Sequence, residues 1–159
     1  MNQENKISVV INTYNAERDL EQVLEAVKDF DEVLICDMES TDATLDIARK
    51  YGCRIVTFPK ANHKSAEPAR TFAIQQASSK WVLVVDADEI VTPQLREELY
   101  RRIASDGCPA GLYIPRLNQF MGKTLTCAYP DYQLRFFIRE GTACWGYVSC
   151  LAVWASQVG

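Results

Sequence analysis

The 159-residue sequence lacks the features that mark several common classes of protein. No apolar run approaches the roughly 18 residues that a membrane-spanning helix needs. The N-terminal stretch Met1 to Lys6 contains no hydrophobic signal region. Basic residues are not in excess, because the formal net charge is -4, whereas nucleic-acid-binding proteins usually carry a basic face. We therefore expect a cytoplasmic protein that binds no nucleic acid.

The sequence also lacks a cysteine pattern typical of metal binding, although it contains six cysteines. No Cys-x-x-Cys pair is present, and Cys36 and Cys53 fall within expected strands, so buried free thiols are favoured over a disulfide or zinc framework. The single histidine, His63, lies in a polar stretch, where a solvated side chain is favoured over a catalytic one. There is no internal repeat or linker, and we expect a single domain over residues 1–159.

The clearest signal in the sequence is the stretch from Trp81 to Glu89, in which apolar residues are followed by three acids. A valine-rich run of this length predicts a strand buried on both faces, and ligands of open α/β sheets bind beyond the carboxyl ends of such strands. In an extended chain, Asp86 and Asp88 would point to the same side. Carboxylate oxygens suit Mg²⁺ or Mn²⁺, often together with substrate phosphates. A solvated acidic turn before the next helix is the alternative.

Short apolar runs alternate with amphipathic segments along the rest of the chain. Strands are expected at residues 7–11, 32–36, 53–58, 81–85, 111–116 and 133–139. Helices are expected around residues 20–27, between 42 and 51, at 68–77 and around 93–103. This alternation predicts an α/β fold with a mostly parallel sheet flanked by helices, in which the strand at 133–139 is antiparallel to its neighbour. The segment 117–132 is long enough to be functional or to contain short elements of its own.

Local signals predict where these helices begin and end. Asn15 is expected to be the N-cap of the first helix, and Gly52 suits the position just after the second. Thr92 followed by Pro93 predicts the start of the fourth helix, and Gly107 its end. Ser40, Thr41 and Asp42 are residue types that cap helices well, and they precede the second one.

Four short motifs follow one another along the chain: Thr13-Tyr14-Asn15, Asp37-x-x-Ser40-Thr41-Asp42, Pro68-Ala69-Arg70-Thr71 and Asp86-Ala87-Asp88. In this order and at these spacings they resemble glycosyltransferase family 2, the inverting enzymes with a GT-A fold, over about residues 7–139. The segments Gln133-Leu-Arg-Phe-Phe137 and Trp145-Gly146 are similar to the subset that adds sugars to bacterial lipopolysaccharide core or other cell-surface glycans. The resemblance implies a Rossmann-like sheet with a short antiparallel C-terminal part.

The resemblance also implies a ligand set. Six residues fall where the family binds the nucleotide of a nucleotide-diphospho-sugar, with a UDP-sugar favoured: Thr13, Tyr14, Glu17, Asp37, Arg70 and Asp86. Asp88 falls where the family holds Mn²⁺ or Mg²⁺ against the diphosphate. By the same resemblance, Tyr14 would pack on the base, Asp37 would accept a hydrogen bond from it, Arg70 would bind phosphate and Asp86 would contact the ribose.

Structural alternatives exist for each of these residues. Tyr14 could be a core aromatic residue, Asp37 could cap the following helix, and Arg70 could pair with an acid on its own helix. Gln133 and Arg135 could reach the acceptor or simply alternate with apolar residues along a strand.

Some positions depart from the family pattern. Met38 stands where many relatives carry a second aspartate, and Thr71 replaces a frequent asparagine. The catalytic base of the family lies downstream of the Asp-x-Asp motif, but no His-Glu pair follows Trp145-Gly146, and no carboxylate follows Glu140. Asp131 and Glu140 are the late candidates, and since neither matches the motif, the catalytic residue is unassigned. We therefore expect a domain truncated at its C-terminus, the product of a disrupted gene, or a domain completed by another chain.

The resemblance implies transfer of a sugar, with inversion, to a glycan or lipid-linked acceptor in cell-envelope polysaccharide synthesis. It is compatible with a place at the inner face of the membrane, with peripheral membrane association and with a homo-oligomer. The alternative is a nucleotide-sugar-binding remnant without turnover. A flavodoxin-like or receiver-like domain is less favoured because of the long polar link 60–67, and a nucleotidyltransferase because residues 12–15 are neither glycine-rich nor basic.

Overall fold

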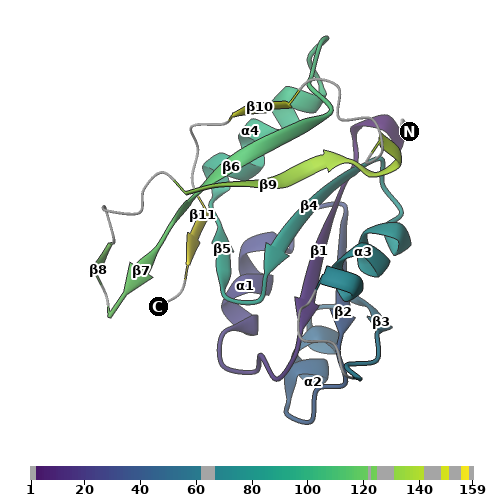
Figure 1. The fold of residues 1–159 in the computed structure, drawn as a ribbon, viewed down its shortest axis with the longest axis vertical. Coiled ribbons are helices and arrows are strands. Elements are labelled where there is room, and N and C mark those ends of the chain that lie inside the picture. Colours follow the sequence, from purple (N-terminus) through teal and green to yellow (C-terminus); the bar gives the residue numbers. More distant parts are fainter. Residues whose placement is uncertain are drawn as a thin grey trace.

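Strands and helices alternate along the first part of the chain, as predicted (Figure 1). The computed structural model describes residues 3–61, 67–121, 123–124, 131–141, 148–150 and 155–157. The helices of this part are η1 (Gln3–Asn5), α1 (Leu20–Val27), α2 (Thr44–Lys50), α3 (Glu67–Gln76), α4 (Pro93–Ile103) and η3 (Arg139–Gly141). The strands are β1 (Ile7–Thr13), β2 (Glu32–Asp37), β3 (Arg54–Thr57), β4 (Trp81–Asp86), β5 (Glu89–Val91), β6 (Gly111–Leu117), β7 (Gln119–Phe120), β8 (Lys123–Thr124), β9 (Asp131–Ile138), β10 (Val148–Cys150) and β11 (Ala155–Gln157).

One large sheet carries the fold, with the strand order β3-β2-β1-β4-β9-β6-β11-β5 and β10 paired to β6. The first four strands in this order are parallel to one another, as the alternation of strands and helices predicts. β9 runs antiparallel between β4 and β6, which confirms the predicted antiparallel strand. The prediction of a mostly parallel sheet with an antiparallel C-terminal part is therefore confirmed, and an all-parallel flavodoxin-like sheet is excluded.

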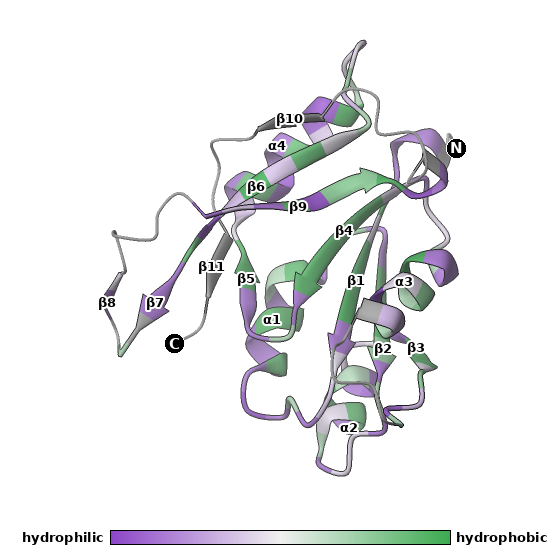
Figure 2. Ribbon diagram, in the orientation of Figure 1, coloured by the Kyte–Doolittle hydropathy of each residue, from purple (hydrophilic) through white to green (hydrophobic). Residues whose placement is uncertain are grey.

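Two apolar layers sandwich the sheet, because successive side chains of a strand point to opposite faces. On one face, the apolar stripes of α1 and α4 pack against β1 and β4, and Ala48 of α2 joins this cluster. On the other face, Ala69 and Ala73 of α3, together with Ala77 directly after it, cover the alternate positions of the same strands. Figure 2 shows the hydrophobic run along β1 and β4, with hydrophilic residues at the tip of β1. The side chains of residues 81–85 are all buried, as predicted for a strand covered on both faces.

Two predicted helix ends are confirmed by their hydrogen bonds. The Thr92 side chain accepts from the Leu95 amide at 3.2 Å, with Pro93 in the first turn of α4. After α2, Gly52 has a φ of 68°. Its amide donates to the Arg49 carbonyl, and the next amide donates to the Ala48 carbonyl, which is a Schellman motif. A glycine is favoured here because the left-handed region is strained for other residues.

Two other predicted helix ends are wrong. Asn15 does not cap α1, which begins five residues later with Asp19 at the N-cap position and no side-chain cap bond. Asn15 instead adopts a φ of 48°, a conformation that asparagine tolerates in turns, and bonds to a neighbouring loop. The α4 helix ends at Ile103 with Ala104 as its C-cap, several residues before Gly107. Gly107 lies in the following turn with a φ of 83°.

The structure adds short strands that the sequence pattern did not predict. β5 begins at Glu89, directly after the acidic turn, and pairs antiparallel with β11. Within the segment 117–132, β7 and β8 form a two-stranded sheet of their own. Three residues are too few to show a periodic pattern, and the partner of β5 is distant in sequence. The β7–β8 pair agrees with the expectation that the segment 117–132 is functional or contains short elements of its own.

The prediction of a buried free thiol within a strand is confirmed for Cys36, whereas Cys53 is only partly buried and lies just before β3. Cys36, Cys53 and Cys108 are free thiols, and burial raises the pKa of both Cys36 and Cys53 to about 11. Cys127 and Cys144 lie outside the described residues. Among the described helices, none combines the length and apolar character that crossing a membrane would require.

Candidate functional site

The polar ends of β1, β2 and β4 meet at one edge of the sheet. Thr13 is paired in register with Asp37 of β2, and Asn12 with Asp86 of β4. The carboxyl ends of parallel strands share an edge, so motifs that are far apart in sequence come together there. The structure thus assembles the strand-end motifs that the sequence analysis singled out.

Asp37 is the most enclosed carboxylate at this edge, with a relative exposure of 1%. The Thr13 hydroxyl donates to Asp37 Oδ1 at 2.8 Å, and the Ser40 hydroxyl donates to the same oxygen at 2.6 Å. The Ser40 amide donates to Asp37 Oδ2 at 2.9 Å. Asp37 therefore closes the turn after β2 and does not cap α2, whose N-cap position is Ala43. A carboxylate can accept about four hydrogen bonds, so about one position remains.

The loops after β1 and β2 are joined by side-chain to backbone hydrogen bonds. The Asn15 amide donates to Ser40 Oγ, and Asn15 Oδ1 accepts from the Thr41 amide, both at 2.8 Å. Glu17 accepts from the Ala43 amide at 3.0 Å through Oε2, and its own amide donates to an oxygen of Asp42 at 3.2 Å. These bonds give the predicted nucleotide-binding residue Glu17 a role in fixing the edge of the site.

Tyr14 is 45% exposed and is not a core aromatic residue. The Nζ atom of Lys60 lies 3.2 Å from the centroid of its ring, in a cation–π contact. The backbone amide of Lys60 also donates to Glu39 Oε2 at 3.4 Å. The Tyr14 ring therefore stands at the rim of the edge, with a positive charge over one of its faces.

Asp86, the last residue of β4, is held by two arginines from different elements. Arg70 of α3 donates to Asp86 Oδ1 at 2.9 Å, so it pairs across the fold rather than with an acid on its own helix. Arg135 of β9 donates to both oxygens of Asp86, at 3.2 and 2.8 Å. Burial by itself would raise the pKa of Asp86, but the bond to Arg135 and the arginine charges outweigh it and lower the pKa. Asp86 is therefore ionised at neutral pH.

The acidic run continues into an ionic network. Glu89 is 4% exposed and accepts from Arg135 Nη2 at 3.1 Å and from Arg116 Nη1 at 3.4 Å through the same oxygen, Oε1. Its other oxygen accepts from the Asp86 amide at 3.0 Å. Arg116 of β6 also binds Asp131 through Nε and Nη2, at 3.1 and 2.8 Å.

Sequence reasoning missed Glu89 and Arg116 and left the role of Arg135 open. The available signal was charge balance, because a run of acids at the end of a buried strand needs cations on the neighbouring strands. Arg116 and Arg135 occupy strand positions beside apolar residues, and this placement could have marked both as partners of the acids. Arg135 lies on β9, in the strand that was predicted, and its side chain reaches the acidic run.

Asp88 differs from its neighbours, since it lies in the turn after β4 and is exposed. Burial of part of the carboxyl group raises the pKa of Asp88, and the charge of Asp86 raises it further. The strand ends at Asp86, so the alternation of an extended chain does not apply beyond it. The alternative of a solvated acidic turn therefore fits Asp88, which is exposed, but not Glu89, which is buried.

The donor chemistry of this turn fits a divalent cation supplied with a diphosphate. Asp88 offers hard carboxylate oxygens, and a cation beside it would relieve the repulsion from Asp86 that raises its pKa. No group of three histidine, cysteine or acidic side chains in the described part of the chain could hold a metal ion without other ligands. Mg²⁺ and Mn²⁺ sites of one or two carboxylates are commonly completed by substrate phosphates and water.

The late candidates for a catalytic base are engaged elsewhere. Asp131 bonds to Arg116 and accepts from Gln133 Nε2 at 2.9 Å. The bond from Gln133 and the arginine charge lower the pKa of Asp131, although burial opposes them. Glu140 is exposed and pairs with Arg139 at 3.1 Å. His63, Trp145 and Gly146 lie outside the described residues.

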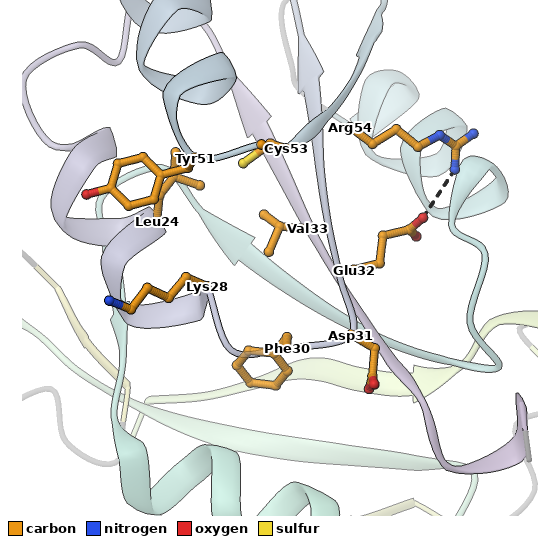
Figure 3. A pocket seen from close by; sticks show the side chains of 10 residues that line it. Leu24, Lys28, Phe30, Asp31, Glu32, Val33, Tyr51, Cys53 and Arg54 are labelled. Carbon is orange, nitrogen blue, oxygen red and sulfur yellow. Dashed lines mark hydrogen bonds and ion pairs between the residues drawn. The ribbon is translucent and has the colours of Figure 1, made fainter. Parts of the chain in front are cut away.

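A separate pocket of about 280 Å³ lies at the opposite end of the strands (Figure 3). It is lined by residues around the start of β2 and the residues before β3, and the figure shows Glu32 bonded to Arg54 at its side. Asp31 in its wall accepts from the Ile7 amide at 2.9 Å and from the Tyr100 hydroxyl at 2.5 Å. Because ligands of open α/β sheets bind at the carboxyl ends of strands, we do not place the functional site here.

Comparisons with known proteins relate the chain to one family of enzymes. The model of glycosyl transferase family 2 matches residues 8–146. A glycosyltransferase of Rickettsia typhi is 35% identical over 101 residues, which cover 63% of this chain and 34% of that protein. The chain thus spans about a third of the length of this relative.

Two solved structures share the fold. The structure of Staphylococcus aureus TarS 1-349 in complex with UDP-GlcNAc has a TM-score of 0.64 and 27% identity, covering 76% of this chain and 36% of that one. TarS is a poly(ribitol-phosphate) beta-N-acetylglucosaminyltransferase. Glucosyl-3-phosphoglycerate synthase of Mycobacterium tuberculosis, in complex with Mn²⁺, UDP and glucosyl-3-phosphoglycerate, has a TM-score of 0.62 and 20% identity, covering 85% of this chain and 57% of that one.

Proposed function

Because this chain belongs to glycosyl transferase family 2, we propose that it takes part in transferring a sugar from a UDP-sugar, with inversion, to a glycan or lipid-linked acceptor in cell-envelope polysaccharide synthesis. The observation that carries the proposal is the convergence of the strand-end motifs at one sheet edge, inside the segment that matches the family. TarS, which binds UDP-GlcNAc and acts on poly(ribitol phosphate), supports a UDP-sugar and a cell-envelope acceptor.

The nucleotide would lie along the ends of β1 and β2. Asp37 has about one acceptor position left after its bonds to Thr13 and Ser40, and this position suits an N–H of uracil. The exposed ring of Tyr14 could stack on the base, since aromatic faces stack on any base. Glu17 would act by holding the two loops together.

The diphosphate would lie near the end of β4. Arg70 is a bidentate phosphate donor by chemistry, and its bond to Asp86 places it beside the acidic turn. Asp86 would contact the ribose, directly or through water. Asp88 would hold Mn²⁺ or Mg²⁺, and the ion would supply positive charge to stabilise the leaving diphosphate.

The reaction forms a bond between an acceptor hydroxyl oxygen and the anomeric carbon of the sugar. The bond between that carbon and the diphosphate oxygen breaks, and the nucleoside diphosphate leaves with the electron pair. The hydroxyl proton passes to a general base on the acceptor side. The positive charge of Arg70, together with that of a cation held by Asp88, would stabilise the negative charge that develops on the leaving group.

Calorimetric titration of UDP and GDP, with and without Mn²⁺, tests the proposal. We expect UDP to bind in a Mn²⁺-dependent manner, and Asp88→Ala to abolish that dependence. Asp46→Ala is the matched control, because Asp46 is an exposed aspartate of α2 paired only locally with Arg49. A folded native protein that binds neither nucleotide would overturn the proposal.

A second candidate function is nucleotide-sugar binding without turnover. It is favoured by the ion pairs of Asp131 and Glu140, which leave both late carboxylates in the described residues engaged with arginines. Metal-dependent UDP binding without hydrolysis or transfer of a UDP-sugar would support this function over the first.

A further inference from the structure

The turn that carries Asp88 is closed by a hydrogen bond to a side chain. Glu89 Oε2 accepts from the Asp86 amide at 3.0 Å, so the carboxylate at the end of the turn binds the residue at its start. Asp88 is between these two residues and is exposed. The position of Asp88 therefore depends on the placement of Glu89.

Glu89 is itself fixed from two other strands. Arg135 of β9 and Arg116 of β6 both donate to Glu89 Oε1, at 3.1 and 3.4 Å. Arg135 binds Asp86 at the same time, so one guanidinium contacts both ends of the turn. Antiparallel pairing of β9 with β4 and β6 brings these arginines to the turn.

The burial of Glu89 is costly for a purely structural residue. Its side chain is 5% exposed, and with Arg135 it borders a small cavity lined by apolar residues, among them Leu83, Leu95 and Ile114. Burying ion pairs seldom stabilises a fold more than apolar residues of the same size would. A carboxylate retained in such a place is therefore a candidate for a role in function.

We propose that Glu89 is a positioning residue, which holds the turn 86–89 so that Asp88 meets the divalent cation of a bound nucleoside diphosphate. This inference rests on the proposed function, because it takes Asp88 as the metal-binding carboxylate. Groups that orient metal ligands typically change metal affinity by about 10–100-fold when they are removed. We expect an effect of that size here, mediated by the Asp86 amide and not by direct contact with the ion.

The test is Mn²⁺ affinity in the presence of saturating UDP, measured from the electron paramagnetic resonance signal of free Mn²⁺. We expect Glu89→Leu to weaken Mn²⁺ binding by about 10–100-fold. Arg135 retains Asp86 and Arg116 retains Asp131 in this variant, so each arginine keeps a partner. Glu89→Gln can still accept from the Asp86 amide, and its Mn²⁺ affinity should fall between those of the native protein and Glu89→Leu.

Glu98→Leu is the matched control, because Glu98 is a carboxylate with a 16% exposed side chain that also binds two arginines, Arg101 and Arg102, but on α4. Its Mn²⁺ affinity should equal that of the native protein. Thermal unfolding followed by circular dichroism identifies which variants are folded.

The outcomes separate this inference from the proposed function. Native-like Mn²⁺ affinity in folded Glu89→Leu, or an equal loss in Glu98→Leu, would overturn the positioning role while leaving the nucleotide site intact. If Glu89→Leu does not fold, native-like affinity of Glu89→Gln overturns it. Failure of the native protein to bind Mn²⁺ with UDP would instead overturn the proposed function.

Discussion

The hydrogen bonds of Asp37 predict how replacing this residue should change the binding of UDP and CDP. Its carboxylate accepts three bonds from Thr13 and Ser40 and has room for about one more. If uracil donates that last bond through N3–H, UDP should bind more tightly than CDP, since cytosine presents an acceptor at the same ring position. Asp37→Asn should then weaken UDP binding and reduce the preference for UDP.

The expected size follows from the charge of the acceptor. A hydrogen bond to a charged group contributes about 1.5–3 kcal/mol, which corresponds to a roughly 10- to 140-fold loss of UDP affinity. The loss of stability should be smaller, about 1–2 kcal/mol, because an asparagine oxygen can still accept from the Ser40 amide. Its NH₂ group would face the hydroxyls of Thr13 and Ser40, which can turn to accept a hydrogen bond.

Calorimetric titration of UDP and CDP in the presence of Mn²⁺, together with urea unfolding, measures both effects. Asp42→Asn is the control, since Asp42 also binds loop groups, the amides of Glu17 and Thr44, but has no proposed contact with the base. It should change stability without changing the ratio of the UDP and CDP affinities. An Asp37→Asn protein that is folded and keeps the native affinity for UDP would show that the base does not bond to Asp37.

Three further predictions concern the rim, the core and the opposite edge. Tyr14→Ala should weaken UDP binding by roughly 5- to 150-fold if the ring stacks on the base, with little change in stability because the ring is exposed; an unchanged dissociation constant would exclude stacking. Leu99→Ala should lower the free energy of unfolding in urea by about 2–5 kcal/mol, because Leu99 is fully buried in the core; a loss below about 1 kcal/mol would contradict that packing. Burial alone would raise the pKa of Glu32, but bonds from Ser78 and Ser8 and the charge of Arg54 outweigh it and hold the pKa below its usual 4.5. The stabilisation from Glu32 is therefore complete above pH 4.5 and is lost as the pH falls from 4.5 through the lower folded value. Glu32→Gln should be less stable than the native protein at neutral pH and should show a flatter decline in acid, measured by urea unfolding at several pH values; parallel curves would argue against this assignment.

The elements with long, periodic patterns could be predicted from sequence. The stripe of Leu95, Leu99 and Ile103 and the valine-rich run of β4 are confirmed, because repeated apolar positions leave few alternatives for which face is buried. The position of Gly52 was predictable because a Schellman motif at the end of a helix needs a residue with a left-handed backbone conformation, which glycine adopts readily. The role of Asn15 was not predictable, since an asparagine before a helix suits an N-cap and a turn equally well.

The short strand β5 could not be predicted, since its pairing partner β11 lies more than sixty residues further along the chain by the bounds of the two strands. Such partners are found only when the sheet forms, because local propensity over three residues is weak. The positions of β7 and β8 were not predicted because each strand has only two residues, although the segment 117–132 was expected to contain short elements of its own.

The order of the main strands and helices, and the polar residues at the ends of β1, β2 and β4, follow from the sequence alone. Local periodicity and turn chemistry carry that information within a few residues. The differences among Asp86, Asp88 and Glu89 arise from tertiary contacts, which leave Asp88 exposed while Asp86 and Glu89 are held by arginines. The partners of Glu89 lie 46 and 27 residues away, and strand register brings them to it. The charge and position of a carboxylate depend on such neighbours, and spacing along the chain does not specify them.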